Sequence, residues 1–349
     1  MKRLILLLVV AATVLSADAP IYGYFWLRYT YDYLMNPDTT SVHANAFSIE
    51  RGYIRWKSTT APVSFSGTID ISQKSGVTKE SDWNVRLKYA QADWLLPYIG
   101  KIIPDMKLIL GLQKVYFGMT DLWEYPLIEK SLEDAEKKIN SADLGVGLNG
   151  LIPGGYGDFA LQVFNGNGYS KPTETDINKA FCANAALVPP VIIPKLGVML
   201  KGSYWTELNP TKYYSAADSE TLSVNLDKNR LAGVLQLKYG PVTLIGEYLL
   251  IQDGKTPDNS IIDGQGYLFF GEIALNNYIS ILGRYDMWDK NVSDTTSSAQ
   301  IDAYDNIIAG VNYKISDAFL LQFNYQLRTY EDIAKAKTDK FMIQCKYSF

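Results

Sequence analysis

Apolar and polar residues alternate along most of the chain after residue 20, with the period of two that is typical of half-buried strands. In 318–328, the side chains of Phe319, Leu321 and Phe323 share one face, and those of Gln322 and Asn324 share the other. The last segment, 340–349, repeats the pattern with one exception, Met342. A soluble β-sandwich alternates in the same way, so periodicity alone does not identify the fold.

Connections of two lengths separate these segments. We predict sixteen strands, at 21–33, 44–57, 62–71, 82–93, 105–114, 142–151, 157–166, 179–188, 196–205, 228–239, 242–252, 265–275, 278–288, 301–313, 318–328 and 338–349. The short connections include 58–61, 240–241, 276–277 and 314–317, and the long ones include 72–81, 115–141, 167–178, 206–227, 253–264 and 289–300. Short and long connections alternate, as in a barrel with turns at one membrane face and loops at the other. The pattern predicts an all-β, transmembrane antiparallel β-barrel, because a closed sheet pairs every backbone amide within lipid.

The N-terminal residues differ from this pattern. Met1-Lys2-Arg3 precedes an uncharged apolar run from Leu4 to Leu15, which is too short to cross a bilayer as a helix and ends at small residues. We predict a signal peptide at 1–17, cleaved after Ala17, with Ala19 as the alternative cleavage position. The barrel domain is then 18–349, and the expected destination is the outer membrane of a Gram-negative-type cell, reached through the periplasm.

Charge and composition exclude several classes of function. The formal net charge is −4, and loss of Lys2 and Arg3 with the signal peptide leaves −6, so nucleic acid is not an expected partner. The single histidine, His43, falls in a polar segment that we expect to be the first external loop. Cys182 and Cys345 belong to strands on opposite sides of the predicted ring, so we expect no disulfide between them. We expect no catalytic residue, metal or cofactor.

The faces opposite the apolar stripes carry more basic than acidic residues. The basic residues predicted to line the pore are Arg28, Arg51, Arg55, Arg86, Lys88, Lys107, Lys201, Lys238, Arg284, Arg328 and Lys346. The acidic residues on the same faces are chiefly Asp70, Glu247, Glu272 and Asp286. This excess predicts a weak preference for anions in the pore. Alternatively, the basic side chains pair with the acids and keep the lumen hydrated.

Three stretches resemble the phosphate-selective porin O and P family. They are FSIERGYIRWK (47–57), LILGLQKVYFGMTD (108–121), and DLGVGLNG (143–150) followed by FALQVFNGNGY (159–169). The resemblance implies a trimeric, sixteen-stranded channel whose longest, third external loop folds into the lumen and narrows it. It also implies that Phe349, with Tyr347 before it, is the signal for the outer-membrane insertion machinery.

The third external loop is then 115–141. Its charged residues are Asp121, Glu124, Glu129, Lys130, Glu133, Asp134, Glu136, Lys137 and Lys138. Ser131 is positioned to cap a short helix in this loop, three residues before Asp134. Two departures weaken the expectation of phosphate selectivity: the loop is acidic, and Glu50-Arg51 stands where many relatives carry adjacent arginines.

These features together predict an outer-membrane porin, a passive channel for small hydrophilic solutes with a weak preference for anions, phosphate or others. The expected partners are outer-membrane lipid, two further copies in a homotrimer, the insertion machinery, and small anionic or neutral solutes. A channel specific for sugars or organic acids is an alternative, supported by inward-facing Tyr24, Trp26 and Trp288. A non-conducting, plugged barrel is another. A barrel enzyme is less favoured, because no histidine is predicted on a strand wall.

Overall fold

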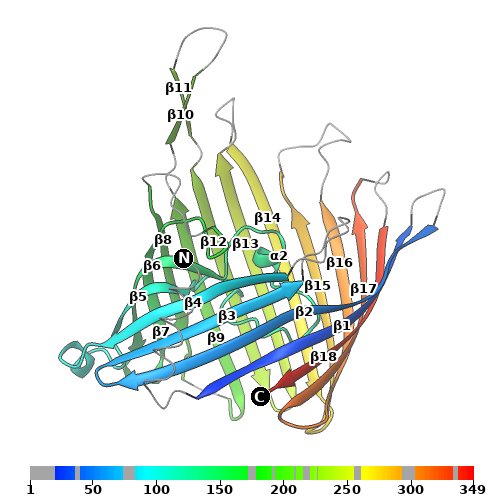
Figure 1. Cartoon of the computed structure of the whole chain (residues 1–349), viewed down its shortest axis with the longest axis horizontal. Helices are drawn as coiled ribbons and strands as arrows, with labels where there is room; N and C mark the ends of the chain where they lie inside the picture. The colour runs from blue at the N-terminus through cyan, green and yellow to red at the C-terminus, as the bar shows by residue number, and fades with distance from the viewer. Residues whose placement is uncertain are drawn as a thin grey trace.

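Sixteen strands close into one antiparallel barrel in the computed structural model (Figure 1). The structure describes residues 20–35, 40–73, 83–171, 178–190, 193–207, 210–214, 221–225, 227–254, 261–292, 303–332 and 337–349. The barrel strands are β1 (Ile21–Met35), β2 (Thr40–Thr60), β3 (Val63–Gln73), β4 (Trp83–Leu95), β5 (Lys107–Lys114), β6 (Ala142–Ile152), β7 (Gly157–Phe164), β8 (Ala180–Leu187), β9 (Leu196–Glu207), β12 (Lys228–Tyr239), β13 (Val242–Gly254), β14 (Ile261–Ala274), β15 (Ile279–Asp289), β16 (Tyr304–Lys314), β17 (Phe319–Tyr330) and β18 (Lys337–Ser348).

The first and last strands close the ring. β1 pairs with β18 from Tyr24 opposite Ser348 to Met35 opposite Lys337. Gly23 and Phe349 exchange backbone hydrogen bonds of 3.0 Å in both directions at the end of this pair. The sheet therefore has no free edge, which is the condition for strands to lie in lipid. The predicted sixteen-stranded fold is confirmed.

The connections sort into two rims, but their lengths overlap more than the sequence predicts (Figure 1). β2 reaches back to Thr40, so only 36–39 separate it from β1, and His43 lies within β2 instead of an external loop. On the turn rim, 96–106 between β4 and β5 is longer than a tight turn and contains the 3₁₀ turn η1 (Ile99–Lys101). A second 3₁₀ turn, η2 (Pro153–Gly155), connects β6 to β7. The long connection 206–227 contains a separate hairpin, β10 (Pro210–Tyr214) and β11 (Thr221–Asn225).

Side chains along the strands alternate between the lumen and the outside. On β16, Ile307 on the outer face is 52% exposed, and Asn306 and Ile308 on the inner face are buried. On β17, Gln322, Asn324 and Gln326 are all buried on the inner face, as the sequence pattern predicts. Within the described residues, no helix is both long and apolar enough to cross a membrane. The predicted signal peptide, 1–17, lies outside the described residues.

The hydrophobic core lies inside the barrel, between the wall and the long connection 115–141, hereafter the lumen loop. Phe117, Leu127 and Leu132 of this loop are fully buried and belong to one cluster with wall residues such as Leu249 and Ile308. This places the loop within the ring of strands, as Figure 1 shows for its short helix α2 (Leu132–Ala135). The loop therefore fills part of the lumen, in agreement with its predicted position.

Candidate functional site

Hydrogen bonds fix the lumen loop to inward side chains of the wall. The backbone N–H of Gly118 donates to Ser203 Oγ on β9 at 3.1 Å, and that of Met119 donates to Glu247 Oε1 on β13 at 2.8 Å. Gly118 has a positive φ, and a Cβ there would lie 2.4 Å from Glu247 Oε1, so glycine is required for this approach. Further along, the Ile128 N–H donates to Asn324 Oδ1 on β17 at 2.6 Å.

The short helix α2 begins immediately after Ser131, but the predicted cap is wrong in its chemistry. The Ser131 side chain makes no capping hydrogen bond. Asp134 instead forms an ion pair with Lys130 at 3.4 Å, one helical turn earlier. Tertiary contacts therefore hold the helix in place, since a single turn of helix is not stable by itself.

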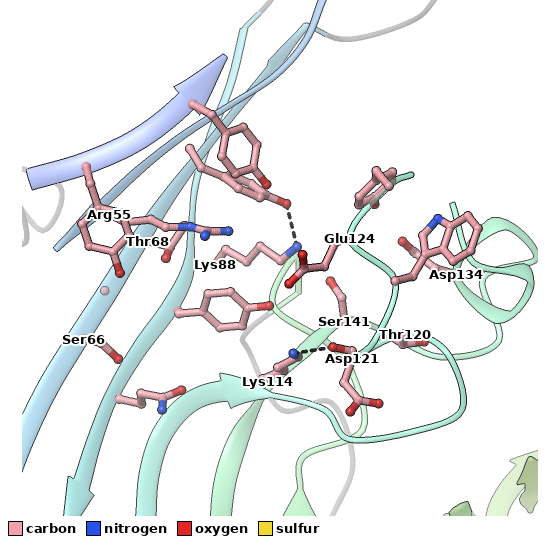
Figure 2. A pocket seen from close by; sticks show the side chains of 18 of the residues that line it. Arg55, Ser66, Thr68, Lys88, Lys114, Thr120, Asp121, Glu124, Asp134 and Ser141 are labelled. Carbon is pink, nitrogen blue, oxygen red and sulfur yellow. Dashed lines mark hydrogen bonds between the residues drawn. The ribbon is translucent and has the colours of Figure 1, made fainter. Parts of the chain in front are cut away.

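A central cavity of about 510 Å³ lies between the lumen loop and the wall formed by β1 to β5 and β18. Four basic side chains line it, namely Arg55, Lys88, Lys114 and Lys346. Figure 2 shows Asp121 and Glu124 of the loop on the side facing Lys88 and Lys114. Neutral polar groups complete the lining, including Ser66, Thr68, Thr120 and Ser141, which Figure 2 also labels.

Tyrosine rings hold these basic groups in place. The Arg55 guanidinium carbon lies 5.1 Å from the ring centroids of both Tyr24 and Tyr53. Lys88 Nζ donates a 2.7 Å hydrogen bond to the Tyr53 hydroxyl, and Lys346 Nζ lies 4.7 Å from the Tyr24 ring. Such contacts orient a cation without neutralising it. Tyr53 is not among the residues predicted to line the pore, although the alternation Arg51-x-Tyr53-x-Arg55 puts it on the same face as both arginines.

Two β-bulges decide which residues reach the lumen. On β2, the register shifts so that Leu27 pairs with Ile49 and Trp26 with Arg51, which leaves Glu50 as an extra residue. Both Glu50 and Arg51 consequently line an inner cavity. On β4, Lys88 is the extra residue, because Thr68 pairs with Tyr89 and Ile69 with Leu87. Tyr89 therefore lines the central cavity, although strict alternation from the inward-facing Lys88 would place it on the outer face.

Four of the other eight basic residues predicted in the pore are paired with acids. The pairs are Arg28 with Glu50 at 3.1 Å, Arg51 with Asp70 at 3.4 Å, Arg284 with Asp286 at 2.7 Å, and Lys201 with Asp121. Arg328 stacks on the Tyr304 ring at 4.2 Å. Arg86 and Lys107 line cavities nearer the two rims, and Lys238 lies exposed on the inner face of β12. The alternative in which cations pair with acids is therefore correct for much of the wall.

The acidic residues of the lumen loop do not all face the basic wall. Asp121, Glu124 and Asp134 line the central cavity. Glu129 accepts a hydrogen bond from Gln326 on β17 at 3.2 Å, and Glu136 accepts one from Tyr304 on β16 at 2.5 Å. Glu133 is fully buried and accepts a 2.7 Å hydrogen bond from the Thr120 hydroxyl. Of the loop's basic residues, Lys138 pairs with Asp253 at 2.8 Å, and Lys137 lines a cavity near the loop rim.

The protonation of loop groups follows from burial and from nearby charges. Burial raises the pKa of the Tyr116 hydroxyl to about 12, so Tyr116 remains a neutral donor at neutral pH. Burial also acts to raise the pKa of Glu129, but the Arg284 guanidinium and the Lys130 N–H outweigh it and hold that pKa below its ordinary value. Glu129 is therefore ionised, and the loop keeps a fixed negative charge on the side away from the central cavity.

Two further cavities adjoin the central one. A cavity of about 440 Å³ toward the loop rim includes Arg51, Arg86 and Lys137, and it shares Asp134 and Ser141 with the central cavity. A cavity of about 370 Å³ toward the turn rim includes Asp93, Asp105 and Asp158. It shares Gln91, Lys114, Tyr116 and Asp121 with the central cavity. The three cavities form a polar series along the lumen beside the loop.

The predicted insertion signal, Tyr347 and Phe349, lies on the outer face of the barrel, where β1 and β18 close the ring. Tyr347 is 51% exposed and Phe349 is 46% exposed, and the Phe349 ring stacks on Phe25 at 5.7 Å. Their role in insertion stays a prediction. Cys182 on β8 and Cys345 on β18 are free cysteines, as expected.

The fold is similar to solved outer-membrane proteins. The outer membrane channel DcaP of Acinetobacter baumannii matches with a TM-score of 0.63 and 11% identity over 95% of this chain and 97% of that chain. OmpF of Salmonella typhi, in complex with daunomycin, matches with a TM-score of 0.61 and 13% identity over 95% and 97%. OmpT of Vibrio cholerae, in its trimer form, matches with a TM-score of 0.55 and 11% identity over 95% and 99%.

No protein-family model and no curated protein matches the chain. At these identities the solved structures establish the fold of a porin barrel, and they do not extend to the phosphate-selective family suggested by the sequence.

Proposed function

We propose that the chain is an outer-membrane porin, a passive channel for small hydrophilic solutes with a weak preference for anions, phosphate among them. The observation that carries this proposal is the series of three polar cavities beside the lumen loop, inside a barrel with an apolar exterior. Adjoining cavities that share lining residues offer a hydrated route from one rim to the other. Polar inner walls of this kind are typical of channel barrels.

The outer surface supports placement in a lipid bilayer. Large apolar side chains are exposed on the outward face of successive strands, for example Leu200, Leu231, Leu244, Phe269 and Ile281. An exposed apolar surface this extensive is unfavourable in water, and outer-membrane lipid is its natural solvent. The homotrimer remains a proposal from the family resemblance, supported by the similarity to a trimeric form of OmpT.

The preference for anions rests on charge that the wall leaves unneutralised. Arg55, Lys88, Lys114 and Lys346 line the central cavity, and none of them has a carboxylate within ion-pair distance in the described parts of the chain. The facing loop carboxylate, Glu124, is exposed, and Asp121 is already paired with Lys201. We expect the net effect to be modest, because salt screens charges over about 8 Å at physiological ionic strength.

Single-channel recording in a planar lipid bilayer tests the proposal. The refolded protein is expected to give discrete current steps in KCl, and a salt gradient is expected to give a small reversal potential of the anion-selective sign. Heat-unfolded protein in the same detergent is the control. Absence of current steps would contradict the channel, and a reversal potential of the cation-selective sign would contradict the anion preference alone.

A further inference from the structure

The basic groups of the central cavity differ from several of the basic groups elsewhere in the lumen. Arg230, Arg284 and Lys201 each have a carboxylate partner, whereas in the described residues the four basic groups of the central cavity have none. Arg55 is the clearest case, because its Nε is buried without a hydrogen-bond partner while two tyrosine rings fix the guanidinium. An oriented guanidinium with a buried, unpartnered Nε and no counter-ion is a site for an external anion, and its planar donors match a carboxylate.

The cavity offers more than charge. The hydroxyl groups of Ser66, Thr68 and Ser141 line it, beside the side-chain amide of Gln91. Each can donate to or accept from a hydroxyl of a solute. An inorganic anion mainly accepts hydrogen bonds, so it would leave the acceptor oxygens of these neutral groups unpaired. A solute with several hydroxyls both donates and accepts, so it can pair with both the donors and the acceptors.

Aromatic rings form the third part of the lining. Tyr22, Tyr89 and Tyr116 contribute ring surface and phenolic hydroxyls to the cavity. An aromatic side chain presents a flat apolar face next to a polar tip, which suits a ring-shaped solute with polar substituents at its edge. Glu124, an exposed carboxylate from the loop, disfavours a second negative charge on that solute by repulsion and can accept a hydrogen bond from a hydroxyl.

The volume of about 510 Å³ is that of a site for a small organic molecule. We propose that the central cavity is a binding site for hydroxylated ring carboxylates of the uronic-acid type, with the carboxylate at Arg55 and Lys346 and the ring against the tyrosines. This inference rests on the proposed channel function and assigns its preferred solute. Lys88, held by the Tyr53 hydroxyl, and Lys114 supply further positive charge along the same wall.

Interruption of single-channel current by added solutes tests this site. Glucuronate is compared with glucose, which lacks the carboxylate, with cyclohexanecarboxylate, which lacks the hydroxyls, and with inorganic phosphate. Glucuronate is expected to interrupt the current at a concentration about tenfold lower than any of the other three, the factor that corresponds to about one charge-assisted hydrogen bond.

Matched variants locate the effect. Arg55→Gln and Lys346→Gln are each expected to raise the half-blocking concentration of glucuronate by about tenfold, the loss of one charge-assisted hydrogen bond. Lys57→Gln removes the same charge on the same strand from an exposed position outside the cavity, and it is expected to have little effect.

The outcomes separate this inference from the channel itself. Equal blocking by glucuronate and cyclohexanecarboxylate, or stronger blocking by phosphate, would overturn the proposed solute class while the channel stands. Unchanged blocking in both the Arg55 and Lys346 variants would overturn the site. Discrete current steps in KCl, whatever their size, show that a variant has folded, and a wild-type protein without any current would contradict the channel instead.

Discussion

Arg51 and Arg55 lie two residues apart on β2, and they differ in what surrounds their charge. Arg51 Nε lies 3.4 Å from the buried Asp70 carboxylate, whereas the Arg55 guanidinium lies over two tyrosine rings and has no carboxylate partner among the described residues. A basic residue that neutralises a buried acid contributes to stability, and an unpaired one contributes to the field in the pore.

The two arginines are therefore predicted to respond differently to the same substitution. Arg51→Ala leaves Asp70 without its ion-pair partner and is expected to lower the free energy of unfolding by about 1–3 kcal/mol. Arg55→Ala is expected to shift the reversal potential toward cations with a much smaller loss of stability. Urea unfolding in detergent and bilayer recording measure the two effects, and equal destabilisation by both substitutions would contradict this division of roles.

The sequence contains a signal for one bulge and not for the other. Glu50 and Arg51 are adjacent charges in a strand, and without a bulge one of them would face lipid at a cost of up to about 2–4 kcal/mol. That conflict predicts the extra residue found at Glu50. No such conflict exists at Lys88-Tyr89, since a tyrosine fits either face, so the place of Tyr89 in the cavity could not be predicted.

At the scale of elements, the lumen loop meets β13 at two buried carboxyl groups, Glu133 and Glu247. Glu247 Oε1 accepts the Met119 N–H of the loop, whereas the Oε2 atoms of both glutamates are buried without a hydrogen-bond partner. Two nearby buried carboxylates repel each other, which favours a proton on one of them. Burial raises the pKa of Glu133, and the Thr120 hydrogen bond only partly opposes it. Asp134 and Arg284 are the nearby charged groups.

A raised pKa in the folded state gives a defined pH dependence. The protonated Glu133 side chain stabilises the folded state. This contribution is complete below the ordinary glutamate pKa of about 4.3 and is lost as the pH rises through the raised pKa of Glu133. Glu133→Gln keeps a hydrogen-bonding side chain without this titration. The thermal unfolding midpoint of the wild type in detergent is therefore expected to fall relative to that of Glu133→Gln as the pH increases over this window.

Glu136→Gln is the matched control for this experiment, because Glu136 flanks the same helix and accepts its hydrogen bond from Tyr304. It is expected to follow the wild-type pH profile. If the thermal unfolding midpoints of the wild type and Glu133→Gln followed the same pH profile, the titration of Glu133 would not contribute to stability.

The barrel strands could be predicted well because each is eight or more residues long, which leaves room for the alternation to repeat several times. The anchoring of the lumen loop could not, because its apolar residues Phe117, Leu127 and Leu132 show no regular period and meet Leu249 and Ile308 from distant strands. The family resemblance implied that this longest loop lies inside the barrel, but it could not give the wall residues that each loop residue contacts.

At the scale of the whole molecule, the barrel brings together charges that lie far apart in the chain. Lys201 on β9 pairs with Asp121 of the lumen loop, eighty residues earlier. Counting inward charges along the sequence therefore overstates the free positive charge of the wall. The structure gathers four cations without a carboxylate partner among the described residues, Arg55, Lys88, Lys114 and Lys346, in one cavity. The sequence pattern alone does not separate these cations from the paired ones.

In the proposed channel, solutes cross the barrel through the central cavity. Ser66 lines this cavity and is half-buried, so Ser66→Cys places a reactive thiol in the proposed route. Leu231→Cys, on the exposed outer face of β12, is the matched control, and the wild type measures the background from its two native cysteines.

Single-channel current before and after labelling with a bulky, negatively charged thiosulfonate is the most direct test. The current through Ser66→Cys is expected to fall to a small fraction of its initial value, with the reversal potential shifted toward cations. The wild type and Leu231→Cys are expected to keep their current. Unchanged current through Ser66→Cys, with complete labelling confirmed by mass spectrometry, would contradict conduction through this cavity.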